Sequence, residues 1–182
     1  MIITIHAGHN PRGKIACGAS DYIDESTAAR WLTRAVTKEL KKLCVTVYNV
    51  TENNGMSQRD VLEKICKKAN SHKRDLDISI HFNAAKHESV SDGKTCGTEC
   101  WVVNKSTTTA LWARNICATI SKYGFTNRGV KETKNLYVLN HTSAPCILVE
   151  VCFVTDTDDA RIWQHNRKSI AKDLALTISK LK

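Results

Sequence analysis

Residues Cys146 to Val154, CILVEVCFV, form an almost unbroken apolar run near the end of the chain. A run of this kind is typical of a strand that is covered on both faces. Such strands occur in sheets that carry helices on both sides, so the remainder of the chain has to supply those helices. The run therefore predicts an α/β fold.

The rest of the chain alternates strand-like and helix-like patterns. Short β-prone or alternating segments predict strands over residues 2–5, 45–50, 77–82, 98–103, 136–139 and 146–154. Apolar residues at helical spacing predict helices over 25–43, 58–69 after a cap at Ser57, 107–123 and about 158–181. We expect one domain over residues 1–182, a twisted, mostly parallel but mixed sheet of about six strands flanked by helices on both faces.

Charge and cysteine content restrict the partners and the compartment. Lys and Arg outnumber Asp and Glu by 27 to 18, a net charge of +9, which favours an anionic partner such as nucleic acid, an anionic lipid surface or an anionic wall polymer. Most of the 8 cysteines lie inside apolar patterns and are expected to be free thiols made in a reducing compartment. The opening MIITIHAGH lacks the pattern of a signal peptide, and no apolar run could insert in a membrane, so we expect synthesis in the cytoplasm.

Glu150 interrupts the apolar run of the predicted central strand. A carboxylate is almost never buried without a partner. One interpretation is a structural carboxylate that pairs with a lysine or arginine, or an edge strand whose second face is exposed to water. The other is a carboxylate at the mouth of a site, close to a cation.

Three more polar residues stand where predicted strands end or a helix begins. His9 lies just beyond the first strand, Glu25 opens the first helix, and His81 ends DISIHF. Ligands of open α/β sheets bind at the carboxyl ends of the strands, so these residues and Glu150 meet if the first, third and last strands are neighbours. Two imidazoles and one carboxylate can hold zinc with an open fourth position, and a second carboxylate can serve as general base. Spacing alone leaves His6 as a competing ligand, and a lone strand-end histidine is more often structural.

Several common catalytic motifs are missing from the sequence. The chain has no HExxH helix, no Walker loop, no GxGxxG after a strand and no GxSxG elbow. Ordinary zinc proteases, nucleotide chemistry and serine hydrolysis of the elbow type therefore have no support.

Six segments in order along the chain resemble the zinc-dependent N-acetylmuramoyl-L-alanine amidases of bacterial autolysins and phage endolysins. They are ITIHAGHN, the GAS…DES stretch, SIHFNA, GTECWVV, NRGVK and L-Y-V-L…LVEVCFVT. The resemblance implies that His9, Glu25 and His81 hold Zn²⁺ and that Glu150 is the catalytic residue. It prefers His9 to His6, and Glu25 to its neighbour Asp24.

The resemblance implies hydrolysis of the amide that joins N-acetylmuramic acid to the L-alanine of the stem peptide. The expected partner is then the peptidoglycan of Gram-positive walls, together with their anionic polymers, which a basic enzyme would concentrate on. We expect a monomer that reaches the wall after the membrane is breached, and that forms the catalytic domain of a longer lysin or a single-domain enzyme.

Asn83 and Arg128 are candidates for holding the substrate, although Asn83 could equally be a loop cap and Arg128 a surface charge. Two rival functions remain at this stage. A basic nucleic-acid-binding module would fit the charge, but the lysines and arginines are scattered and no nucleic-acid motif is present, so no nucleic-acid partner is expected. Another wall-directed zinc peptidase or deacetylase would differ in the end group that it releases.

Overall fold

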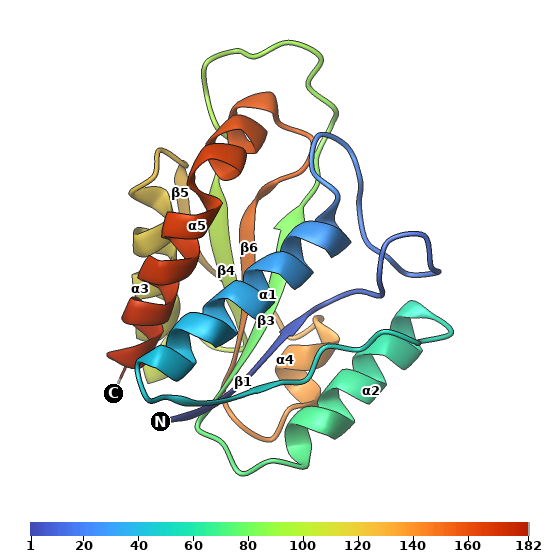
Figure 1. Cartoon of the computed structure of the whole chain (residues 1–182), viewed down its shortest axis with the longest axis vertical. Coiled ribbons are helices and arrows are strands. Elements are labelled where there is room, and N and C mark those ends of the chain that lie inside the picture. Colours follow the sequence, from blue (N-terminus) through green and yellow to red (C-terminus); the bar gives the residue numbers. More distant parts are fainter. Residues whose placement is uncertain (182) are drawn as a thin grey trace.

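The apolar run forms β6 (Cys146–Phe153) in the interior of a six-stranded sheet, between β3 and β4. The computed structural model describes residues 1–181, and the strand order is β2-β1-β3-β6-β4-β5 (Figure 1). The other strands are β1 (Ile2–Ala7), β2 (Thr46–Asn49), β3 (Leu76–Asn83), β4 (Thr98–Val102) and β5 (Asn127–Glu132). The helices are α1 (Glu25–Lys42), α2 (Gln58–Asn70), α3 (Thr108–Ser121), α4 (Tyr137–His141) and α5 (Thr157–Ser179).

The sheet is mixed, with one antiparallel pairing. β1 pairs in parallel with β2 and β3, β3 with β6, and β4 with β5, whereas β4 runs antiparallel to β6. The carboxyl ends of β1, β3 and β6 therefore meet at one edge, together with the amino end of β4. The predicted fold class is confirmed, and so is the adjacency of the first, third and last strands on which the predicted site depends.

Helices cover the two faces unequally. The larger core packs α1, α3 and α5 against one face, with Ile78 and Ile80 of β3 among its members. The smaller core packs α2 and α4 against the other face, around Leu148 of β6. Side chains alternate along a strand, so Ser79 and His81 point to the α2 and α4 side.

The start of α1 is fixed by its cap. Asp24 is the N-cap, and its side chain accepts a hydrogen bond from the Thr27 backbone N–H at 2.8 Å. The carboxylate of Asp24 thereby satisfies a free helix N–H, as capping residues commonly do. Glu25 is then the first residue of the helix, and the predicted cap at Ser57 is confirmed in the same way for α2.

The strand predicted over 136–139 is wrong, because residues 137–141 form the short helix α4. Four consecutive apolar residues do not distinguish a strand from a buried turn of helix. Val138 and Leu139 pack against α2, and His141 Nδ1 bonds to the Tyr137 carbonyl oxygen at 2.9 Å. The sixth strand is instead the polar segment β5, an edge strand that pairs only with β4.

All eight cysteines are free in the structure, five of them buried. None of the helices described in residues 1–181 combines the length and the apolar character that crossing a membrane requires.

Candidate active site

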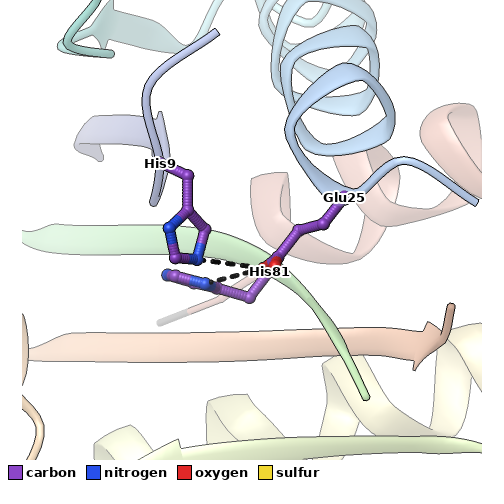
Figure 2. Close-up of side chains that lie close together, drawn as sticks. All are labelled: His9, Glu25 and His81. Carbon is purple, nitrogen blue, oxygen red and sulfur yellow. Dashed lines mark hydrogen bonds and ion pairs between the residues drawn. The ribbon is translucent and has the colours of Figure 1, made fainter. Parts of the chain in front are cut away.

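His9, Glu25 and His81 converge at the edge where the parallel strands end. Figure 2 shows the imidazoles of His9 and His81 next to each other, both joined by dashed lines to the Glu25 carboxylate, which enters from the first turn of α1. Glu25 Oε1 lies 3.2 Å from His9 Nε2 and 3.1 Å from His81 Nδ1. The possible ligand atoms of these three residues all lie within 4.8 Å of one another, so the group could hold a metal ion.

The far side of each imidazole is held by a hydrogen bond. His9 Nδ1 donates to Gln58 Oε1 at 3.0 Å, and His81 Nε2 lies 3.1 Å from Ser79 Oγ. Partners of this kind fix the orientation and tautomer of metal-binding histidines. The other nitrogen of each ring faces Glu25, where it could act as a ligand.

Backbone groups hold the Glu25 carboxylate. Its Oε2 accepts from the Ala19 N–H at 2.9 Å, and its Oε1 accepts from the Phe82 N–H at 3.2 Å. Burial alone would raise the pKa of Glu25, but the hydrogen bonds from His81 and His9 hold it well below its usual range. The carboxylate is therefore ionised, as a metal ligand must be.

His6, the competing ligand, lies outside this cluster. Its side chain is fully buried, its Nδ1 is 3.4 Å from the Ala7 carbonyl oxygen, and its Nε2 has no hydrogen-bond partner within residues 1–181. Burial, reinforced by His81, lowers the pKa of His6 to about 3. The structure thus brings His9, the histidine that the resemblance prefers, together with Glu25 and His81. His6 is instead a neutral residue of the core.

The buried His6 makes the apo protein sensitive to acid. Its pKa is lower in the fold than the usual 6.5, so its contribution to stability is complete above pH 6.5 and is lost as the pH falls towards 3. In the presence of chelator, we expect the wild type to lose about 2 kcal/mol more than His6→Asn between pH 7 and pH 5. Urea unfolding at the two pH values measures this difference, and equal losses would contradict a neutral buried His6.

Gly8 leaves the space that the His81 ring occupies. A Cβ on Gly8 would lie 1.9 Å from both Cε1 and Nε2 of that ring. The ring is buried between Glu25 and Ser79, so it has no free volume into which to retreat.

We therefore expect Gly8→Ala to displace His81 and to lower metal affinity by about 10- to 100-fold, the usual range for disturbing the support of a ligand. Competition with a fluorescent zinc chelator measures the affinity, and urea unfolding of the apo protein serves as the control for folding. Wild-type affinity in a folded Gly8→Ala would show that His81 is not a ligand.

Glu150 stands beside His81 on the neighbouring strand. The two residues are register partners between β3 and β6, and Glu99 of β4 is the register partner of Glu150 on its other side. Glu150 Oε2 is buried and has no hydrogen-bond partner among the described residues. Burial, with the negative charges of Glu25 and Glu99, raises the pKa of Glu150 to about 8. Within residues 1–181 no lysine or arginine pairs with Glu150, so the structural ion pair considered for this residue is not found there.

Asn83 and Arg128, the two candidate substrate-binding residues, both bind Glu99. Arg128 Nε donates to Glu99 Oε2 at 2.7 Å, and Asn83 Nδ2 donates to Glu99 Oε1 at 3.2 Å. Trp101 Nε1 also donates to Glu99 Oε1, at 3.1 Å. Asn83 also accepts from the Ala84 N–H, as in the loop cap considered for it, and Arg128 is ion-paired while its side chain stays 39% exposed.

Sequence reasoning missed Glu99, Gln58 and Ser79. Glu99 and Ser79 could have been noticed, because strand periodicity places both on the face that carries the site. Nothing local to Gln58 signals its role, since its partner His9 is 49 residues away in the chain.

Comparison with known proteins identifies the family. A family model described as N-acetylmuramoyl-L-alanine amidase matches residues 3–180. The chain belongs to this family. The family match thus covers every residue of the cluster described above.

Some relatives of this chain are longer proteins. A 38.4 kDa protein of Clostridium perfringens is 37% identical over 186 residues, which cover 99% of this chain and 52% of that protein. The endolysin of Bacillus phage SPP1 is 27% identical over 185 residues, 96% of this chain and 62% of the endolysin. The chain thus spans about half the length of the first relative and somewhat more of the second.

Solved structures of an endolysin and of an amidase have the same fold. The catalytic domain of the CD27L endolysin targeting Clostridium difficile superposes with a TM-score of 0.85 at 24% identity, over 98% of this chain and 96% of that one. The catalytic domain of the N-acetylmuramoyl-L-alanine amidase CwlV from Bacillus (Paenibacillus) polymyxa gives 0.79 at 19% identity, over 100% of both chains. At these identities the likeness establishes the fold.

Proposed function

We propose that this chain hydrolyses the amide bond between N-acetylmuramic acid and L-alanine in peptidoglycan, with zinc as its metal. The observation that carries the proposal is the cluster of His9, Glu25 and His81 beside the unpartnered carboxylate of Glu150. The family supports peptidoglycan as the substrate class, and the relatives that are endolysins support a role in lysing walls.

The cluster fits zinc in its chemistry. Two imidazoles and one carboxylate form the usual protein ligand set of a catalytic zinc, which keeps a further position open. His9 Nε2, His81 Nδ1 and a Glu25 oxygen would hold the ion, since Gln58 and Ser79 already bind the remaining imidazole nitrogens. A bound zinc would supply Lewis acidity toward the scissile carbonyl and acidify water.

Glu150 would move the proton. Amides have poor leaving groups, so water must lose a proton and the departing alanine nitrogen must gain one. A carboxylate with a raised pKa can take the first proton and deliver it to the nitrogen. In the apo chain burial and the neighbouring carboxylates raise the pKa of Glu150 to about 8, and a cation held by His9, Glu25 and His81 would lower it again, so that the carboxylate could accept the proton.

Asn83 and Arg128 would hold the substrate beside Glu150, because both converge on the carboxylate next to it. The net charge of +9 fits a Gram-positive wall, whose polymers and stem peptides are anionic. Lysis after the membrane is breached is the cellular role that we infer.

End-group analysis of purified Gram-positive peptidoglycan tests this function. We expect new N-terminal alanine without new reducing sugar ends, and loss of that release when a strong chelator is added. New reducing ends would indicate a glycosidase. New termini of other amino acids would indicate a peptidase of the same wall.

A further inference from the structure

A cavity of about 330 Å³ lies under the long loop between β3 and β4. Figure 1 shows this loop extending beyond the sheet, close to the amino end of α5. Arg128 is one of the residues that line the cavity, and its partner Glu99 is the register neighbour of Glu150. The ion pair of Arg128 with Glu99 thus lies between the cavity and the proposed catalytic carboxylate.

The guanidinium of Arg128 is held on three sides. Its Nε donates to Glu99 Oε2 at 2.7 Å, and its Nη1 donates to the Cys96 carbonyl oxygen at 3.3 Å. Its central carbon lies 5.0 Å from the centre of the Phe153 ring, a cation–π contact. Within residues 1–181 no group accepts a hydrogen bond from Nη2. The guanidinium is therefore held in place while its Nη2 can still donate to a ligand.

Three basic and three acidic side chains line the cavity. Lys86 and Lys94 line it and have no ion-pair partner within residues 1–181. The three acidic residues that line it already accept backbone N–H groups: Glu88 from Thr157 at 2.9 Å, Asp92 from Lys94 at 2.8 Å and Asp156 from Cys96 at 2.9 Å. Among the charged side chains of the lining, the basic ones therefore keep donors for a ligand, and the guanidinium edge of Arg128 matches a carboxylate.

We propose that Arg128, oriented by Glu99, binds a carboxylate of the substrate's peptide in this cavity and so selects stem peptides that carry one. This inference rests on the proposed function and adds the chemical group that the enzyme recognises. Arg128 is the specificity-determining residue. Glu99 is a positioning residue, because it acts through Arg128.

Two soluble muramoyl peptides that differ in a single group test the inference. One carries a free carboxylate in the stem peptide, and the other carries the neutral primary amide at that position. A hydrogen bond to a charged group contributes enough for the wild type to prefer the carboxylate by about 10- to 100-fold in kcat/KM. We expect Arg128→Gln to remove the preference, mainly by raising KM for the carboxylate substrate, so that the two peptides are cleaved with similar kcat/KM.

Glu99→Gln should reduce the same preference, and the double variant should lose no more than Arg128→Gln alone, since the two residues act as one unit. Arg114→Gln, which removes an exposed arginine of α3, is the matched control and should keep the wild-type ratio.

Equal cleavage of both peptides by the wild type would overturn the inference and leave the amidase function standing. An equal loss on both substrates in Arg128→Gln, or additive losses in the double variant, would also overturn it. Cleavage of neither peptide by the wild type would contradict the proposed function and this inference with it.

Discussion

Replacing Glu150 with glutamine should lower kcat by about 10²- to 10⁴-fold, the range that a positioned general acid–base contributes. Glutamine keeps the volume of the side chain but can neither take nor deliver the proton. The variant should stay folded, because burying an ionised carboxylate near the negative charges of Glu25 and Glu99 is unfavourable, and these causes raise the pKa of Glu150 to about 8. An uncharged amide there should leave the apo protein at least as stable at neutral pH.

Three measurements on one preparation test the role of Glu150. Release of alanine from peptidoglycan gives the rate, metal analysis gives the zinc content, and thermal unfolding gives the stability. Glu63→Gln, on an exposed part of α2, makes the same chemical change away from the site and should behave as the wild type. Loss of zinc from Glu150→Gln would make Glu150 a ligand, and a change in rate below about fivefold would make it structural.

Removing the metal should lower the activity at least as much as Glu150→Gln does. We expect added zinc at about 100 times its Kd to raise the Tm of the chelator-treated wild type by about 5 to 10 °C, because binding at that ratio contributes about 2.7 kcal/mol. His81→Ala should show neither this shift nor any activity. The reason is that His81 contributes one of only three ligands in the cluster.

A matched control separates the site from adventitious binding of zinc. His165→Ala removes an exposed histidine of α5 and should keep both the full shift and the full rate. An equal shift in His81→Ala would place the zinc elsewhere, and full activity after exhaustive chelation would contradict a metal-dependent reaction.

The architecture and the convergence of the site could be predicted from the sequence because both follow from local patterns. The apolar run of β6 and the helical spacing of α1, α2, α3 and α5 can each be recognised within a short segment of the sequence. The position of His9 and His81 at strand ends then follows from a general property of open sheets. The resemblance settled the choice of His9, which spacing could not.

What the sequence did not reveal depends on tertiary contacts. β5 is polar because it lies at an edge, so its residues lack the pattern of a buried strand. α4 is helical because Val138 and Leu139 pack on α2. Four consecutive apolar residues do not by themselves predict that contact. Glu99 gains its importance from Arg128, 29 residues away, and from Glu150 across the sheet.

Mass spectrometry of one defined substrate tests the proposed chemistry most directly. A soluble N-acetylmuramoyl peptide is digested with the zinc-loaded chain in ¹⁸O-labelled water. We expect a sugar fragment whose lactyl carboxylate carries one ¹⁸O atom and an unlabelled peptide with a free amine on L-alanine, and neither product from Glu150→Gln. Label in a peptide carboxylate, a freed acetate or an opened glycosidic bond would contradict the assignment of this site to muramoyl-alanine hydrolysis.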